Sequence, residues 1–370
     1  MIDKKGTIYS AVFDEHRDYT SSSIFLGEER GLFDTINKPF PKLWKHYKTL
    51  KSLDWDENEV AYSSCNLDFK TCSKATYDAM IKTLAWQWEA DSIAGHSLIA
   101  IMSPFITSSE ATAAWTKITE NEILHAATYS EIVRESFDDP SAVLEEILEV
   151  QEAKDRLVVV SDIIYEAQQA SHKYALGYID NDQHLYNTVY LFIVAMLALE
   201  RIQFMSSFAV TFSICDTGAF IPFGKAVQKI AQDELEVHVQ YGKDVLRYEH
   251  LTERGKLAQK QLAPTIATLL EEVVDSELDW VDYLFSEGRS LVGLNKSLLQ
   301  DWVLFNAADV YRFLGIDSSY IFPKKNPLPY MERWLNMNLI QAAPQEEDLT
   351  AYKVGVMRRD DEDKVFEVTF

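Results

Sequence analysis

The 370-residue chain has little cysteine, no run of basic residues and no apolar run long enough to cross a bilayer. Its three cysteines, Cys65, Cys72 and Cys215, show no paired spacing, and no secretory signal stands at the start. We therefore expect neither disulfides nor a structural zinc site, but a reducing, cytoplasmic location. The most apolar stretch, residues 190–199, ends at Glu200, well short of the roughly 20 residues of a transmembrane helix.

Positive charge is also scarce, because 58 acidic residues outnumber 35 basic ones and give a formal net charge of −23. Such a chain repels the phosphate groups of nucleic acids and the surfaces of anionic membranes. We therefore exclude nucleic acid and membrane as partners. Proteins and small molecules remain.

Proline and glycine are sparse in the middle of the chain, where long helical patterns follow one another without strand-like alternation. We expect helices over residues 74–101, 109–137, 140–176, 187–214, 224–249, 262–284 and 297–314. Loops and short helices up to Trp55 form a wrapping arm. Beyond Pro323 the composition turns polar and acidic, typical of a flexible tail. The prediction is an all-α bundle over residues 1–335 with a tail over residues 336–370.

Two of the eight histidines follow a glutamate by three or four residues, at Glu122 and His125 and at Glu234 and His238. Residues at this spacing share one face of a helix. A carboxylate and an imidazole on one face are typical metal ligands, and two such helices plus two further carboxylates make a two-metal site in a bundle. A single copy of this spacing is common by chance on solvated helices.

Asp91 and Glu200 are the candidates for the further carboxylates. Glu200 interrupts an apolar run, so its charge needs a partner or a metal. An ion pair with Arg201 is the alternative, but adjacent residues of a helix point about 100° apart. Asp91 taken alone fits a surface aspartate better. With all six ligands, four carboxylates balance two divalent cations and leave coordination positions for dioxygen.

These segments, in this order, resemble the small, radical-generating subunit of class I ribonucleotide reductase, a ferritin-like di-metal family. The resemblance covers nearly the whole chain. It rests on Glu122-Ile-Leu-His125 followed by Tyr129, on Leu199-Glu-Arg-Ile-Gln-Phe204, on Trp280-Val-Asp-Tyr-Leu-Phe285 and on Gly293-Leu-Asn-Lys296. It implies a ferritin-like bundle that uses an oxygen species to oxidise Tyr129. The oxidising equivalent would pass to a large catalytic subunit that reduces ribonucleotides to deoxyribonucleotides.

The resemblance also implies a role for each ligand. Asp91, Glu122 and His125 would hold one metal ion, and Glu200, Glu234 and His238 would hold the other. The two ions are expected to be iron, with a dimanganese or a mixed manganese and iron pair as alternatives. A homodimer is expected as well.

Tyr129 would carry the radical, shielded by Phe204, Phe208 and Ile230. Trp55 and Asp233 would link the metal ligand His125 to the large subunit. In the tail, Tyr352 would relay the radical, and the segment around Ala343-Pro-Gln-Glu346 would dock on the large subunit. For Trp55 and Tyr129 alone, ordinary core packing is the alternative.

The chain departs from the family at its second histidine helix, where three residues instead of two separate Glu234 from His238. A single-turn π-bulge would absorb the extra residue. Glu236 is the alternative ligand, although it points roughly 200° away from Glu234. An iron-storage ferritin, a di-iron oxygenase or desaturase, and a purely structural bundle are the competing functions.

Overall fold

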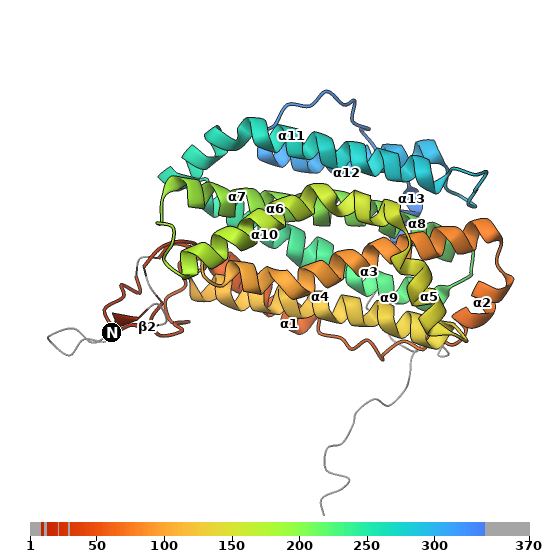
Figure 1. Cartoon of the computed structure of the whole chain (residues 1–370), viewed down its shortest axis with the longest axis horizontal. Coiled ribbons are helices and arrows are strands. Elements are labelled where there is room, and N and C mark those ends of the chain that lie inside the picture. The colour runs from red at the N-terminus through yellow and green to blue at the C-terminus, as the bar shows by residue number, and fades with distance from the viewer. Residues whose placement is uncertain (1–8, 11–12, 21, 29, 337–370) are drawn as a thin grey trace, which may run out of the picture.

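The computed structural model describes residues 9–10, 13–20, 22–28 and 30–336, and its long helices run side by side along the longest axis (Figure 1). This arrangement confirms the all-α prediction; the strands of the described part form one two-stranded antiparallel sheet. The elements are β1 (Tyr9–Ser10), β2 (Phe13–Asp14), α1 (Pro41–Ser52), α2 (Cys65–Thr71), α3 (Lys74–Met102), α4 (Ser109–Ser136), α5 (Pro140–Leu148), α6 (Gln151–Ala175), α7 (Gln183–Ala198), η1 (Leu199–Gln203), α8 (Phe204–Cys215), α9 (Ile221–Asp233), η2 (Glu234–His238), α10 (Val239–Glu249), α11 (Glu253–Leu284), α12 (Lys296–Leu314) and α13 (Pro329–Trp334).

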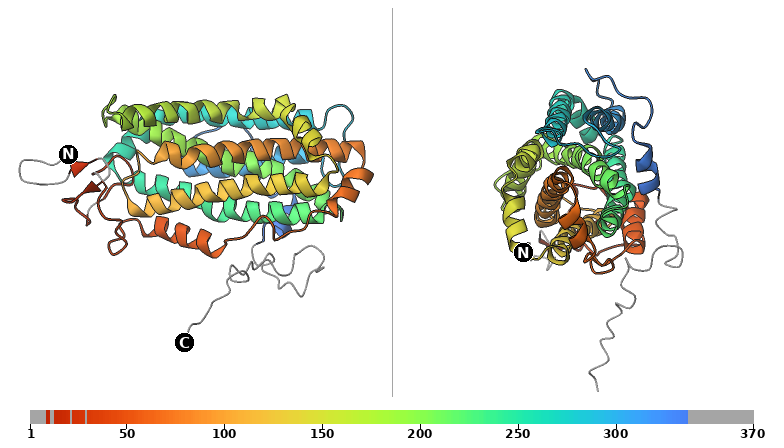
Figure 2. Two further views of the ribbon diagram at one scale, coloured as in Figure 1. Left: turned by 60° about the horizontal axis from the view of Figure 1, so that its bottom comes forward. Right: turned by 90° about the vertical axis from the view of Figure 1, so that its right-hand side faces the viewer.

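Side-chain caps explain where the core helices start. Ser73 accepts a hydrogen bond from the backbone N–H of Thr76 at the start of α3, and Ser108 does the same at α4. Each cap satisfies an N–H that has no partner within the helix. Helix α3 packs against α4 and α6, and α11 packs against α6, α7 and α12. In the end-on view of Figure 2, α11 and α12 lie together on one side of the bundle.

The predicted single helix over residues 140–176 is wrong, because the chain turns at Glu149 and Val150 between α5 and α6. Neither proline nor glycine marks this turn. Val150 is buried there, so contact with the bundle accompanies the break.

The predicted start of a helix at Leu262 is also wrong. Helix α11 begins nine residues earlier, at Glu253, and is capped by Thr252. Pro264 sits inside the helix on its exposed side, where water can reach the carbonyl left without a donor.

Two helices expected to be continuous are interrupted by single π-helical turns. Helix α7 continues through η1 into α8, and α9 continues through η2 into α10. The second turn is the π-bulge predicted between Glu234 and His238, whereas the first was not foreseen. A π turn holds one extra residue and shifts the register of the side chains that follow. Both turns carry candidate ligands.

The segment Gln183–Cys215 is the one stretch of the described residues that is long and apolar enough to cross a membrane by length and composition. Within its most apolar window, 83% is buried inside the protein. Its apolar side chains contact other helices of the bundle, so it is a core helix. The apolar run is longer than the sequence analysis allowed, because it continues past Glu200.

Glu249 ends α10 as a buried carboxylate with one partner. Its side chain accepts a hydrogen bond from the hydroxyl of Tyr186 on α7. Burial raises the pKa of Glu249 to about 7, although the Tyr186 bond and the charge of Arg254 act in the opposite direction. The folded protein therefore resists ionisation of this group at neutral pH.

We predict that Glu249→Gln makes the protein more stable at high pH and leaves it unchanged at low pH. Because the pKa of Glu249 is raised in the folded state, its carboxyl contributes fully to stability at pH values below the ordinary pKa near 4.5. This contribution is lost as the pH rises through about 7. The gain in unfolding free energy at pH 8 should be roughly 3 kcal/mol. Urea unfolding at both pH values measures it, with the exposed Glu272→Gln as control. Equal gains at both pH values would contradict the prediction.

Candidate metal centre

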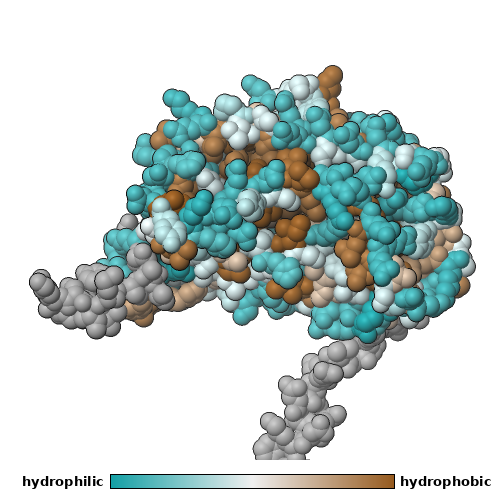
Figure 3. All heavy atoms as spheres, viewed as in Figure 1, coloured by the Kyte–Doolittle hydropathy of each residue, from teal (hydrophilic) through white to brown (hydrophobic). Residues whose placement is uncertain are grey.

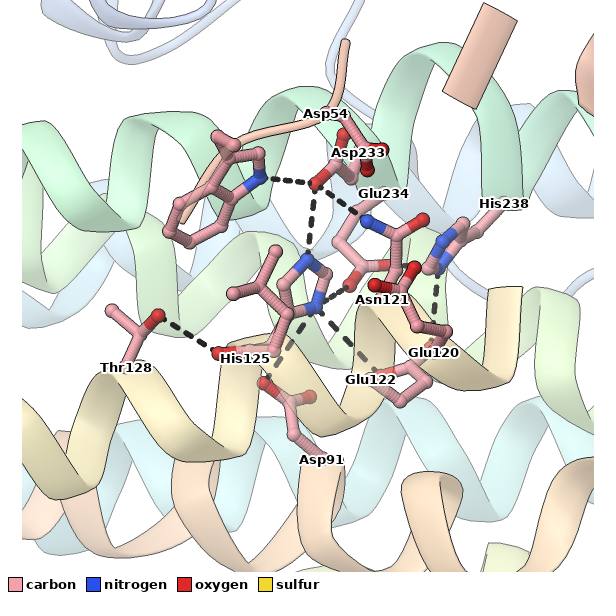
Figure 4. A network of polar contacts seen from close by, with 12 residues as sticks. Asp54, Asp91, Glu120, Asn121, Glu122, His125, Thr128, Asp233, Glu234 and His238 are labelled. Atoms are coloured by element: carbon pink, nitrogen blue, oxygen red, sulfur yellow. Dashed lines mark hydrogen bonds and ion pairs between the residues drawn. The ribbon is translucent and has the colours of Figure 1, made fainter. Parts of the chain in front are cut away.

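Six buried side chains from four segments of the bundle meet in its core. Helix α3 contributes Asp91, α4 contributes Glu122 and His125, η1 contributes Glu200, and η2 contributes Glu234 and His238. Each of the six is at most 5% exposed. Figure 4 shows five of them pointing toward a common centre between α4 and the helix that carries Glu234. These are the six residues named as ligands from the sequence.

The six side chains form two overlapping groups, each of which could hold a metal ion. One consists of Asp91, Glu122, His125 and Glu234, and the other of Glu122, Glu200, Glu234 and His238. Within each group, the potential ligand atoms lie within 4.8 Å of one another. Glu122 and Glu234 belong to both groups, so each can bridge two ions. From the resemblance, Glu122 and Glu234 were each expected to hold one metal ion only.

The distances between these side chains are short, but most of the contacts are not hydrogen bonds. His125 Nδ1 lies 3.0 Å from Glu234 Oε1, and His238 Nδ1 lies 2.7 Å from Glu234 Oε2. Even so, these atoms lack hydrogen-bond partners of acceptable geometry, as do both carboxylate oxygens of Asp91 and of Glu122. Buried polar atoms normally have partners. Their lone pairs converge on shared points instead of on one another, which fits metal ions as the missing partners.

The charges of the cluster need compensation. Burial, and next the charge of Glu122, raise the pKa of Asp91; burial, and next the charge of Glu234, raise the pKa of Glu200. Burial opposes protonation of His238, but the charge of Glu234 prevails and raises its pKa to about 10. Protons thus compensate the buried carboxylates when no metal is bound, and metal ions would replace them.

The donor set suits iron or manganese. It contains carboxylate oxygens and imidazole nitrogens but no thiolate, since none of the three cysteines belongs to either group. Hard and borderline donors of this kind favour iron and manganese over thiolate-bound metals. Glu200 is free to act as a ligand, because Arg201 pairs with Asp309 on α12. The alternative ion pair between Glu200 and Arg201 is therefore absent.

Tyr129 lies one helical turn beyond His125 on α4 and is fully buried. Burial raises the pKa of its hydroxyl well above the usual value, and the nearby carboxylate of Asp91 adds to this. The hydroxyl makes no hydrogen bond of acceptable geometry among the described residues. Tyr129 is therefore a neutral phenol beside the candidate ligands, shielded from water.

Asp233, the last residue of α9, joins the cluster to Trp55. Its Oδ2 atom accepts hydrogen bonds from Trp55 Nε1 at 2.8 Å and from Asn121 Nδ2 at 3.2 Å, and lies 3.2 Å from His125 Nε2 (Figure 4). The Trp55 ring stacks near the ring of His125, with 6.1 Å between centroids. Sequence reasoning named Trp55 and Asp233 but missed Asn121, whose only signal is its place one residue before Glu122. Tyr352 lies outside the described residues.

Comparison with known proteins supports one family. The model of the family described as "Ribonucleotide reductase, small chain" matches residues 33–327. The chain is 25% identical over 362 residues to "Ribonucleoside-diphosphate reductase 1 subunit beta" of Escherichia coli O157:H7, covering 94% of this chain and 95% of the relative. It is 24% identical over 339 residues to the beta subunit of Enterobacteria phage T4, covering 85% and 87% of the two chains.

Solved structures share the fold. The ribonucleotide reductase R2 subunit from Clostridium botulinum superimposes with a TM-score of 0.77 at 17% identity, over 89% of this chain and 99% of that one. The dimanganese(II)-NrdF of Streptococcus sanguinis gives 0.65 at 15% identity, over 82% and 98%. An R2-like ligand-binding oxidase with a Mn/Fe cofactor gives 0.57 at 17% identity, over 76% and 95%.

We predict that Glu234→Ala abolishes metal binding whereas Glu236→Ala leaves it intact. Glu234 is fully buried and belongs to both groups, so its loss should reduce the content from about two ions per chain to nearly none. Glu236 is exposed on the same π turn and belongs to neither group, which makes it a matched control. Elemental analysis after anaerobic loading decides. Full metal content in Glu234→Ala, or loss in Glu236→Ala, would reassign the ligand.

Proposed function

This chain belongs to the ribonucleotide reductase small-chain family, and from that premise we propose that its buried cluster generates a radical on Tyr129. The chain is a ribonucleoside-diphosphate reductase small subunit and acts together with a large subunit. The observation that carries the proposal is a neutral, fully buried phenol one helical turn from His125, beside a cluster of six side chains most of whose converging oxygen and nitrogen atoms lack hydrogen-bond partners. A ferritin or a structural bundle needs no such phenol.

Bound metal ions would supply the redox chemistry that removes an electron from Tyr129. The chain's own residues would hold the ligands in register, exclude water and take up the proton. Among the neighbouring carboxylates, Asp91 has the largest electrostatic effect on the Tyr129 hydroxyl. We therefore assign Asp91 as the acceptor of the phenolic proton. The apolar side chains of Phe204, Phe208 and Ile230 are buried in the same core and would keep solvent reductants away.

The route for the oxidising equivalent would be His125, Asp233 and Trp55. The Oδ2 atom of Asp233 is within hydrogen-bond distance of both rings, so it can accept the indole proton when Trp55 loses an electron. Asn121 donates to the same oxygen and would hold the carboxylate in this orientation. We assign Trp55 and Asp233 to radical transfer and Asn121 to positioning.

Iron is the first expectation for both metal ions. The oxygen and nitrogen donors support iron and manganese alike, so a dimanganese or a mixed manganese and iron pair are the alternatives. The relatives with solved structures include a dimanganese(II) protein and one with a Mn/Fe cofactor.

The chain would work as a homodimer. Helices α3, α5 and α6 surround a surface hollow of about 580 Å³, lined by apolar side chains that include Trp88, Ile93 and Leu157. Leu144 and Leu148 on its rim are 40% and 51% exposed, and Figure 3 shows apolar residues gathered in the middle of this face. Apolar area of this kind supports a contact between two copies. Sedimentation of the purified protein as a monomer would contradict it.

We assign residues 1–335 to the helical domain and residues 336–370 to a tail that docks on the large subunit, in the cytoplasm. Residues 337–370 of the tail lie outside the described residues, and the tail's sequence supports the assignment. It is rich in acidic residues and ends in aromatic ones, Phe366 and Phe370. Charge can steer an encounter while a few aromatic side chains become buried on the partner.

Tyr129→Phe should keep the metal ions and abolish the organic radical. Phenylalanine has no phenolic proton to release, and the lost hydroxyl makes no hydrogen bond among the described residues, so folding should be unaffected. Electron paramagnetic resonance of protein loaded anaerobically with Fe(II) and then exposed to air measures the radical. Tyr241→Phe is the matched control, because Tyr241 is also buried with a hydroxyl that lacks a partner. An unchanged radical signal in Tyr129→Phe would place the radical elsewhere.

Truncation after Trp334 should leave the metal site and the Tyr129 radical intact but reduce binding to the large subunit to background. Tyr352→Phe should preserve both binding and radical while stopping turnover, because phenylalanine cannot give up a proton with its electron. Binding, radical content and turnover measured on both variants separate docking from relay. Normal turnover in Tyr352→Phe would refute the relay role.

A further inference from the structure

A buried arginine lies between two tryptophans in the same core. Arg156 on α6 is 2% exposed, and its Cζ atom lies 3.8 Å from the ring centroid of Trp86 and 4.9 Å from that of Trp280. Its guanidinium group is held on its edges. Nη2 donates to Glu277 Oε2 at 2.7 Å and to the Gln203 carbonyl at 2.8 Å, and Nη1 donates to Ser207 Oγ at 2.9 Å.

These two indoles belong to a line of aromatic rings that leads out of the core. The ring centroid of Trp86 lies 4.8 Å from that of Phe204, the residue that follows η1. Trp86 also precedes the candidate ligand Asp91 by five residues on α3. On the far side of Arg156, the Trp280 centroid lies 5.7 Å from that of Tyr283, which is partly exposed. Rings this close can pass an electron, so the line is a potential leak from the oxidised site to the surface.

Every oxidisable ring on this line faces a cation. Arg156 lies over Trp86 and Trp280, while Tyr283 has Arg289 Cζ at 5.2 Å from its centroid and accepts a hydrogen bond from Lys82 Nζ at its hydroxyl, at 2.7 Å. A cation over an aromatic face stabilises the neutral ring. It repels a ring that has lost an electron, and burial strengthens the repulsion. The carboxylate of Glu277 bonds to the Nε and Nη2 edge of the guanidinium group, while its Cζ atom lies 3.8 Å from the Trp86 centroid.

The indole protons of this line have nowhere to go. Nε1 of Trp86 and Nε1 of Trp280 are buried without a hydrogen-bond partner among the described residues. An oxidised Trp86 would therefore stay a cation beside another cation. Trp55 differs, because its Nε1 donates to the Asp233 carboxylate at 2.8 Å. Both cations are ion-paired, Arg156 with Glu277 and Lys229 with Glu59, but Lys229 Nζ lies 5.6 Å from the Trp55 centroid, farther than Arg156 Cζ lies from either indole.

We propose that Arg156 insulates the radical site by making Trp86 and Trp280 hard to oxidise, so that the oxidising equivalent leaves only through Trp55. This rests on the proposed function. The step that Arg156 suppresses is the transfer of one electron from Trp86 to the oxidised site, which would leave an indole cation radical and a site reduced by one electron. Arg156 affects the electron transfer only through its charge beside Trp86, so it is a positioning residue and not a catalytic one.

The test uses the full chain in a Tyr129→Phe background, where the oxidising equivalent lacks its preferred residue. Protein with ring-deuterated tryptophan is loaded with Fe(II), exposed to air and frozen for electron paramagnetic resonance. Adding Arg156→Met with Glu277→Gln, which avoids an unpaired buried carboxylate, should increase the tryptophan radical roughly tenfold or more. Adding Trp86→Phe should remove the increase. Arg156→Lys, which keeps the charge, should show none.

A radical yield unchanged by Arg156→Met with Glu277→Gln, in protein with full metal content and an unaltered circular dichroism spectrum, would overturn the insulating role. An equal increase in Arg156→Lys would also overturn it, because packing and not charge would then be responsible. A merely structural Arg156 lowers the melting temperature without creating a deuterium-sensitive signal.

A second pair of variants decides the question even where the Arg156 changes prevent folding. In the Tyr129→Phe background, Trp86→Phe should leave the tryptophan radical yield unchanged, whereas Trp55→Phe should lower it. A lower yield in Trp86→Phe would overturn the proposal. Failure of the unsubstituted chain to oxidise its metal ions or to form any radical would overturn the proposed function itself. Metal analysis and the spectrum of that chain distinguish this outcome from failure of the Arg156 proposal.

Discussion

The structure depends on keeping four carboxylates and two imidazoles in an apolar core. Each of these groups is costly to bury alone, and ionised carboxylates only a few ångströms apart repel one another strongly. The raised pKa values of Asp91, Glu200 and His238 show that bound protons reduce the negative charge of the cluster when no metal is bound. Four segments of the bundle must stay in register for two cations to replace those protons. The long, well-capped helices provide this rigidity.

The two π turns are the local devices that make this register possible. Without η1 and η2, the side chains that follow Glu200 and Glu234 would be rotated by about one residue around their helices. A regular helix would then direct Phe204 or His238 differently. Both turns occur where a ligand enters the core, in agreement with the tendency of such bulges to lie at functional sites.

Much of this could be predicted from the sequence, because helical periodicity and the spacing of Glu122 and His125 are local. The ends of α3 and α4 followed from Pro104 and Pro140, which stand just beyond these two helical patterns. What could not be predicted depends on tertiary contact. The turn at Val150 has no proline or glycine to mark it, and the shared role of Glu122 and Glu234 appears only when α4 and η2 face each other. Arg156 and Glu277 lie 121 residues apart, so nothing local pairs them.

The sharing of Glu122 and Glu234 between the two ligand groups has a consequence for how the site fills. A first ion held by both carboxylates would fix the orientation of their side chains, including the oxygens that face the other ligand group. The second ion would then meet ligands that are already ordered, so the two binding events are coupled. Partly filled protein should be a mixture of empty and doubly loaded chains. The choice of metal at one position would thereby bias the choice at the other.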